Sequence, residues 1–290
     1  MPLTTYDDVR PWARAIKDQI LTRRMPIWQA AHGYGAFAND PSLTPVEMAM
    51  IAAWVDGGQP RTGSPSSSGS PGSPGSGSPG SGSIVDPVVS AFRRKSARLP
   101  IAASATSASA RIDAAWIAGW YFEPGDPLVT SATIASADGA AIGTWVAGDG
   151  PVVLPAGAGM RVASPLRIEL ERRKAADYEK PFVPARSVLR VVPLTEPPAR
   201  RVWLEEARCG TPRTGRSAAL LAVRPLLASG ASARIWLERP GAPRTIVGWF
   251  RDADIRYLRA YWLARPTDLP PESRIQSDTP CRLELTLATR

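Results

Sequence analysis

Residues 167–171 read Arg-Ile-Glu-Leu-Glu, and residues 233–238 read Ala-Arg-Ile-Trp-Leu-Glu. In both stretches every second side chain is apolar, so an extended strand would have one apolar face and one face turned to water. Strands of this kind are typical of antiparallel sheets that bury a single face. Similar runs recur at residues 187–192, 201–205, 245–250, 257–263 and 282–287. The pattern predicts an all-β region in the C-terminal part of the chain.

The size of this region indicates how it is divided. It spans about 200 residues, which is ample for two small cores, and a proline-rich break stands at Pro197 and Pro198. We therefore predict a mainly β protein with two antiparallel, jelly-roll-like β-sandwich subdomains. Their expected bounds are residues 84–195 and residues 196–290.

A linker precedes the β region. Residues 63–83 consist only of glycine, serine and proline. Such a segment has no apolar surface to bury, so we predict a disordered linker over residues 61–83. Its root-mean-square span of roughly 25 Å would join two bodies without fixing their geometry.

Residues 1–60 are predicted to form a short helical module. Thr5 with Asp8, and Thr44 with Glu47, have the spacing of capping boxes, which mark helix N-termini. Helical spacing of apolar residues follows each cap, and we expect the first helix to include Arg23 in its last turn. Two helices leave much apolar surface uncovered, which indicates that part of this module's core is missing.

The composition excludes several classes of active site. His32 is the only histidine among the 290 residues, and there are two cysteines. Zinc fingers, multi-histidine copper or iron sites within the chain, and a Ser-His-Asp triad in the C-terminal 230 residues therefore lack their ligands or bases. His32 itself is expected to be a loop residue. The apolar runs are shorter than the roughly 18–20 residues of a membrane helix, so no membrane span is expected.

The charge is basic, with a net value of +9 and a predominance of arginine. An arginine-rich domain is compatible with nucleic-acid binding, which would show a steep salt dependence. The longest basic cluster is only Arg172-Arg173-Lys174, and no RNP-type, helix-turn-helix or KH signature is present. We therefore expect solvated strand faces rather than a nucleic-acid partner; a protein partner stays open.

The N-terminal residues resemble a bacterial c-type cytochrome-like module. The resemblance rests on residues 2–13 (PLTTYDDVRPWA), 24–28 (RMPIW), 43–44 (LT) and 53–58 (AWVDGG). It implies that Met25 is an axial ligand of haem c, provided that a Cys-x-x-Cys-His motif lies upstream; an ordinary core methionine is the other reading. We accordingly expect that Met1 is not the natural start.

The β region resembles the copper type II, ascorbate-dependent monooxygenases of the peptidylglycine hydroxylating type. The similar segments are residues 123–129 (EPGDPLV), 143–149 (GTWVAGD) and 154–157 (LPAG). The family's histidine ligands fall at Thr130, Ser131, Glu171, Arg172, Leu226 and Ala228. No methionine follows Met160 to supply the family's methionine ligand. The resemblance thus implies the double-sandwich fold, whereas the changed residues predict no metal ligand and no bound copper.

Together these features predict a non-catalytic scaffold or binding protein derived from a haem–copper monooxygenase, with no catalytic residue. The resemblance implies an extracytoplasmic location, periplasmic or secreted. The alternative is an electron-transfer or oxidoreductase protein whose haem attachment motif lies upstream.

Two further features leave alternatives open. Cys209 and Cys281 either form a disulfide that closes a loop of about 70 residues or remain two buried thiols. The strand tryptophans are expected to pack in the sandwich cores, the other reading being an aromatic platform for sugars or single strands. They are Trp116, Trp120, Trp145, Trp203, Trp236, Trp249 and Trp262.

Overall fold

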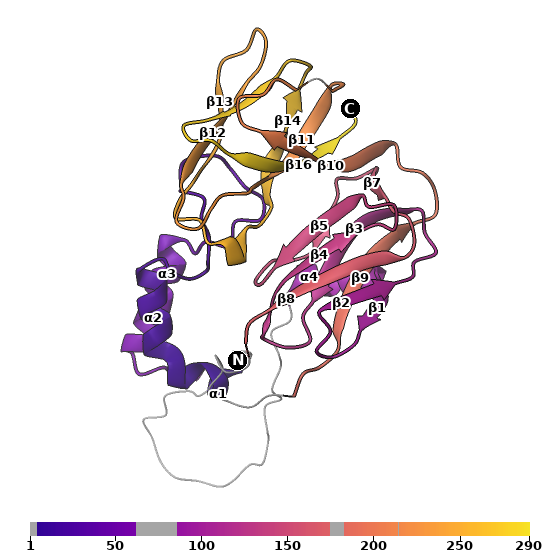
Figure 1. Cartoon of the computed structure of the whole chain (residues 1–290). Coiled ribbons are helices and arrows are strands. Elements are labelled where there is room, and N and C mark those ends of the chain that lie inside the picture. Colours follow the sequence, from indigo (N-terminus) through magenta and orange to yellow (C-terminus); the bar gives the residue numbers. More distant parts are fainter. Residues whose placement is uncertain (1–4, 62–85, 175–182, 214) are drawn as a thin grey trace, which may run out of the picture. The chain divides into compact units, whose positions relative to one another are not determined.

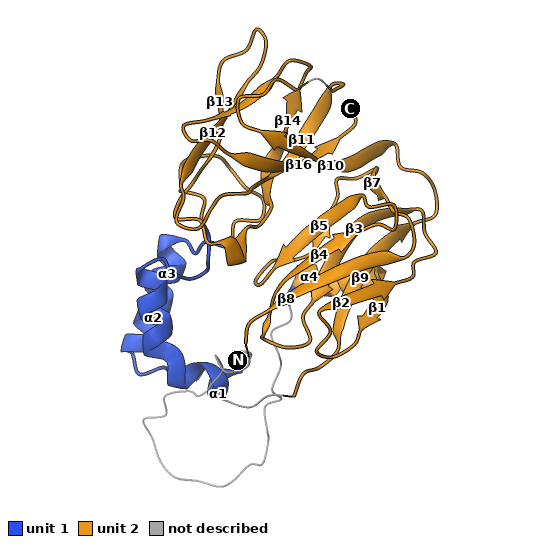
Figure 2. Cartoon of the chain, in the orientation of Figure 1, with its two compact units in different colours: residues 1–28, 41–86 blue, residues 29–40, 87–290 orange. Residues whose placement is uncertain are grey.

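The computed structural model describes residues 5–61, 86–174, 183–213 and 215–290. It is mainly β, with helices in the N-terminal part (Figure 1). The chain divides into two compact units (Figure 2): residues 1–28 with 41–86, and residues 29–40 with 87–290. Except for Arg61, the predicted linker lies outside the described residues. No helix in the described part is long and apolar enough to cross a membrane.

The first unit contains the predicted helices, α2 (Ala13–Leu21) and α3 (Pro45–Asp56), after a short α1 (Tyr6–Val9). Both predicted capping boxes are confirmed, at Thr5 and at Thr44. The first helix differs from expectation in two ways. It is interrupted by a 3-10 turn at Arg10–Trp12, where a proline supplies no amide hydrogen. It also ends at Leu21, before Arg23, whose φ of 54° is left-handed.

From residue 87 on, the second unit starts with helix α4 (Pro87–Lys95), which the sequence did not predict, and continues with a first lobe of nine strands. Eight of its strands form two sheets, in the orders β1-β9-β3-β7 and β2-β8-β4-β5, and β6 pairs with β3. This order is that of a jelly roll. The bounds are β1 Ala97–Ile101, β2 Ser107–Ala110, β3 Trp116–Glu123, β4 Val129–Ala135, β5 Ala141–Val146, β6 Val152–Val153, β7 Ala158–Arg161, β8 Leu166–Arg172 and β9 Ser187–Leu194.

The core of this first lobe lies between its two sheets. Phe122 of β3 packs against Trp145 of β5, with ring centroids 5.0 Å apart. On β8, Leu166, Ile168 and Leu170 are buried while the residues between them are not, which confirms the predicted alternation.

The second lobe has the same strand order as the first lobe, except that its second strand is reduced to a single bridge. Its sheets have the orders β10-β16-β11-β14 and β13-β12-β15. A single bridge between Pro212 and Arg274 occupies the place of the second strand of a jelly roll. The bounds are β10 Arg200–Arg208, β11 Ala218–Pro225, β12 Ala233–Glu238, β13 Thr245–Phe250, β14 Tyr261–Leu269, β15 Arg274–Ser277 and β16 Arg282–Ala288. The strand predicted at residues 257–263 thus begins only at Tyr261, because Ile255–Tyr257 form a 3-10 turn capped by Asp254.

The two lobes share a continuous hydrogen-bonded sheet. β7 of the first lobe pairs in parallel with β10 of the second, with Gly159 opposite Arg201. The sheet therefore runs β1-β9-β3-β7-β10-β16-β11-β14. Two sandwiches are present, as predicted, but they are joined by backbone hydrogen bonds.

Residues 29–40, which we call the strap, lie on the second lobe and not with the helices among which residues 1–60 were placed. The strap pairs with β13 through an Ala30–Phe250 bridge and with β14 through a Phe37–Leu263 bridge. Each of these strands lies at the end of its sheet, so it has backbone groups free to pair with an added segment. The strap therefore completes both sheets of this lobe, which is the physical reason for the difference.

Candidate functional site

The structure brings two of the expected copper positions together in the first lobe. Ser131 on β4 lies directly opposite Glu171 on β8. The hydroxyl of Ser131 donates a hydrogen bond of 2.9 Å to Oε2 of Glu171. The hydroxyl of Thr130 donates to the backbone oxygen of Glu171 at 3.2 Å.

An ion pair stands beside this hydrogen bond. Arg172 Nη2 lies 2.6 Å from Oδ2 of Asp126, whose side chain is only 1% exposed. The other carboxylate oxygen of Asp126 accepts a hydrogen bond from the amide of Leu128 at 2.9 Å. The expected ligand positions are therefore tied into the strands by their own polar partners.

The donor set at these positions does not fit copper. Hydroxyl, carboxylate and guanidinium groups replace the imidazoles that bind copper of this type. The third expected pair lies in the other lobe, where Leu226 is half-buried and Ala228 is exposed. In the described ranges no group of three or more His, Cys, Asp or Glu side chains is placed to hold a metal ion.

A second polar cluster lies where the two lobes meet. Asp149, between β5 and β6, forms an ion pair of 3.3 Å with Arg259, whose side chain is 5% exposed. Nearby, Arg224 of β11 lies 3.6 Å from Glu284 of β16. Burial raises the pKa of Asp149 to about 6, although Arg259 and Arg224 oppose the shift. Burial also raises the pKa of Glu284. The sequence held no signal for this cluster, because its members are far apart along the chain.

The raised pKa of Asp149 predicts a pH-dependent stability. The folded state binds the proton of Asp149 more tightly than the unfolded chain does. The protonated carboxyl therefore contributes to the free energy of unfolding below about pH 4, and this contribution is lost as the pH rises through about 6. The free energy of unfolding should fall by about 2–3 kcal/mol over this interval. Urea titrations at several pH values should show a smaller slope for Asp149→Asn. Because the pKa of Glu284 is also raised, Glu284→Gln should lose only the part of the slope that Glu284 contributes, and the double variant should have the smallest slope. An unchanged slope in Asp149→Asn would contradict the assignment.

An apolar cavity of about 820 Å³ lies against the first lobe. It is lined by α4, by residues 153–158 and by the segment that leads from β9 to β10. Phe92 of α4 packs edge-on against Tyr121, with centroids 6.3 Å apart. Lys95 and Glu196 are the charged residues of its lining. The volume is in the range of small-molecule sites.

Aromatic and basic side chains gather on the outer face of the β13-β12-β15 sheet. The guanidinium carbon of Arg234 lies 4.7 Å from the ring centroid of Trp249, and that of Arg244 lies 4.4 Å from the ring centroid of Trp236. Arg251 also lies over Trp249, at 5.3 Å. We call these five residues the Trp–Arg face. The alternation in residues 233–238 already turned Trp236 outward, because Ile235 and Leu237 face the core.

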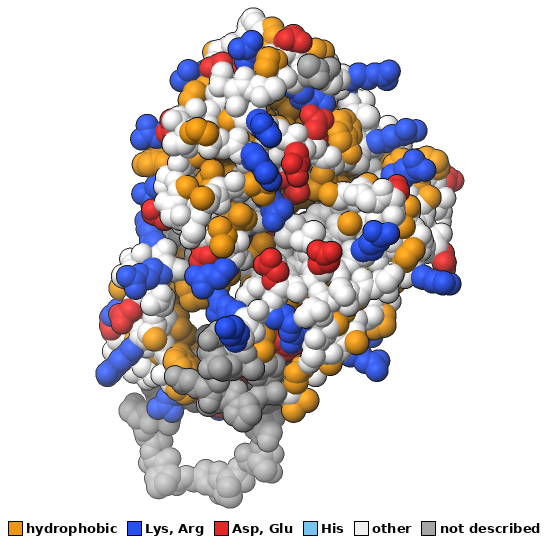
Figure 3. Space-filling view, viewed as in Figure 1, with side chains coloured by type: hydrophobic (Ala, Val, Ile, Leu, Met, Phe, Trp, Pro, Cys, Tyr) orange, Lys and Arg blue, Asp and Glu red, His pale blue; other side chains and the backbone are white. Residues whose placement is uncertain are grey.

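The tryptophans match the expectation in part. Trp120 and Trp145 are buried in the core, as predicted. The other five strand tryptophans are half-buried: Trp116, Trp203, Trp236, Trp249 and Trp262. Of these, Trp262 packs against the buried hydrophobic cluster. On the face of the molecule drawn in Figure 3, Lys and Arg side chains are interspersed with apolar and acidic ones.

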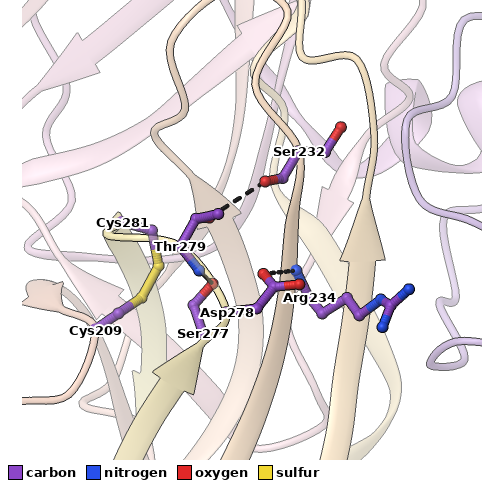
Figure 4. The surroundings of a disulfide bond; sticks show 7 residues. All are labelled: Cys209, Ser232, Arg234, Ser277, Asp278, Thr279 and Cys281. Atoms are coloured by element: carbon purple, nitrogen blue, oxygen red, sulfur yellow. Dashed lines mark hydrogen bonds between the residues drawn. A yellow bond between two sulfur atoms is a disulfide. The ribbon is translucent and has the colours of Figure 1, made fainter.

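Cys209 and Cys281 form a disulfide, the first of the two alternatives (Figure 4). Their Cα atoms are 5.4 Å apart, and the amide of Cys209 donates to the backbone oxygen of Cys281 at 3.0 Å. Just before Cys281, the Asp278 carboxylate accepts a hydrogen bond from the Arg234 amide at 2.8 Å. The disulfide therefore stands in a hydrogen-bonded part of the second lobe.

The remaining expected site residues lie apart from these clusters. Met25 follows α2 in the first unit and is 53% exposed, so it is not an ordinary core methionine there. Its role as a haem ligand stays a prediction. His32 is an exposed residue of the strap, as expected for a loop histidine.

Comparisons with known proteins assign no family. No family model matches the sequence, and no curated protein matches it. Among solved structures, the chain is similar to the major capsid protein P2 of bacteriophage PM2, with a TM-score of 0.34 and 11% sequence identity. That similarity covers 67% of this chain and 96% of the capsid protein.

Proposed function

We propose that the chain is a non-catalytic scaffold or binding protein built on two jelly-roll sandwiches. The observation that supports this proposal is the filling of the expected copper positions. Ser131 and Glu171 face each other on paired strands and are hydrogen-bonded to each other. A sandwich buries its strands without needing a metal, so the scaffold can persist when the chemistry is lost.

Loss of copper chemistry is the first prediction of this proposal. In the presence of ascorbate and added copper, the purified chain should consume oxygen no faster than copper and ascorbate alone. The reason is that no imidazole stands at the expected positions to hold and tune the ion. An oxygen electrode measures the rate. His32→Ala is the matched variant, because it removes the one imidazole of the sequence. Saturable, protein-dependent oxygen uptake that survives in this variant would contradict the proposal.

The Trp–Arg face is the surface that we propose for ligand binding. Arg244 is ion-paired with Glu238 at 3.4 Å, so the guanidinium groups of Arg234 and Arg251 are the ones that favour an anionic ligand. The two indole rings favour a ligand with flat or apolar parts. Glu238, which accepts a hydrogen bond from the Trp236 indole at 2.9 Å, holds one ring in place. This combination suits an acidic polymer better than a neutral small molecule.

Heparin serves as a polyanion probe for this surface. Trp249→Ala should weaken heparin binding about tenfold, since it removes the ring on which two arginines stack. Arg98→Ala, an exposed arginine on β1, is the matched control and should have little effect. Calorimetry at two salt concentrations measures the affinity and its salt dependence. Equal losses in both variants would show that binding follows overall charge and not this face.

The alternative proposal is electron transfer through a c-type haem with Met25 as axial ligand. The residues described do not fit covalent haem attachment, because Cys209 and Cys281 are joined to each other in the second lobe. This alternative therefore depends on attachment cysteines upstream. The visible absorption spectrum of the native protein, and its change in Met25→Ala, would test it.

A further inference from the structure

The strap contacts the second lobe as an added strand at two sheet edges. At β13, the amide of Ala31 donates to the backbone oxygen of Trp249 at 2.7 Å. The backbone amide of Arg251 donates to the backbone oxygen of Gln29 at 2.9 Å. At β14, Ala38 donates to the oxygen of Trp262 at 2.7 Å. These bonds are of the kind that hold peptides added to the edge of a sheet.

The side chains of the strap add specificity. Phe37 enters an aromatic cluster, with centroids 6.1 Å from Phe250 and 5.3 Å from Tyr261. The side-chain amide of Asn39 donates to the oxygen of Ala260 at 2.8 Å, and its oxygen accepts from the Trp262 amide at 2.9 Å. One aromatic anchor and one bidentate amide thus fix the register of the segment.

Gly35 permits the close approach of the strap to the lobe. Its φ is +83°, and a Cβ atom at this position would lie 2.2 Å from the backbone oxygen of Val247. A residue with a side chain would therefore push the strap away from β13.

The covalent connection between the strap and its lobe is long. The strap ends at residue 40, and the second unit resumes at residue 87. The 46 residues between them, 41–86, are assigned to the first unit, so the strap is joined to its lobe only through that unit. Connections of this kind allow an edge-docked segment to be exchanged between identical chains.

We propose that the edges of β13 and β14 together form a receptor for a peptide with the sequence of the strap, and that they accept this segment from a second copy of the chain. The receptor binds the strap by backbone pairing at both edges and by the ring contacts of Phe37 with Phe250 and Tyr261. In one chain its own strap occupies these edges, so a second strap must compete with it.

A fluorescent peptide of residues 27–41, titrated into the full chain, tests the receptor. Phe37→Ala weakens the chain's own strap, so this variant should bind the wild-type peptide at least about tenfold more tightly than the wild-type chain does. His32→Ala, an exposed strap position, should bind it like the wild type. Should Phe37→Ala fail to fold, Asn39→Ala provides the same test through two hydrogen bonds. Equal binding by these variants and the wild type, or no binding to the variants, would overturn the proposal.

Exchange between copies is tested on chains that carry a specific protease site within residues 63–83. Light and isotopically heavy chains are cut, mixed and examined by native mass spectrometry. We expect the two fragments to remain paired and to form mixed light–heavy pairs. Separation of the fragments after cutting, or pairs that never mix, would overturn the proposal.

Discussion

Replacing Cys209 and Cys281 by serine is expected to lower the free energy of unfolding by about 4 kcal/mol. The disulfide joins residues 72 positions apart, and without it the unfolded chain regains the entropy of that loop. The native structure should change little, because β10 and β16 remain paired up to Arg208 and Arg282, next to the cysteines. This strand pairing keeps the two ends of the loop together in the folded state.

Urea unfolding of the oxidised protein, the reduced protein and the double variant measures this loss. The reduced wild type is the control, since it should lose about as much stability as the variant. A loss under about 1 kcal/mol in both would contradict the entropic account.

The second large effect concerns the ion pair at the expected copper position. Arg172→Met should lower the free energy of unfolding by about 3 kcal/mol, because it leaves the carboxylate of Asp126 buried without its cation. The double variant Asp126→Asn with Arg172→Met removes the uncompensated charge and should recover part of this loss. Thermal and urea unfolding of the two variants measure the difference. A double variant less stable than the single one would show that Asp126 stabilises the fold through other contacts.

The sequence predicted the elements whose local pattern repeats. The alternation on β8 and β12 matches their buried faces, because a strand in a sandwich turns every second side chain into the core. The caps at Thr5 and Thr44 were predicted because a helix N-terminus needs acceptors for its first amides. These features depend on a few neighbouring residues.

The sequence did not predict the features that arise from distant pairing. The strap has no hydrophobic period, and its place is set by the free edges of β13 and β14, more than 200 residues later in the chain. The pairing of β7 with β10 also depends on how two lobes meet. The Asp149–Arg259 ion pair was not predicted for the same reason, because the two residues are far apart along the chain. Ser131 and Glu171 are paired across β4 and β8, whereas the resemblance that made them equivalent to copper-ligand positions stays a prediction.

Copper stoichiometry tests the central claim that this scaffold has lost its metal chemistry. Chains loaded with copper, desalted and measured by atomic absorption should retain well under one copper per chain. In Ser131→His with Glu171→His, two imidazoles would stand opposite each other on β4 and β8, and retention should rise toward one copper per chain, since two or more imidazoles are the usual minimum for such sites. The account is contradicted if the wild-type chain itself retains one copper with an imidazole-type spectrum.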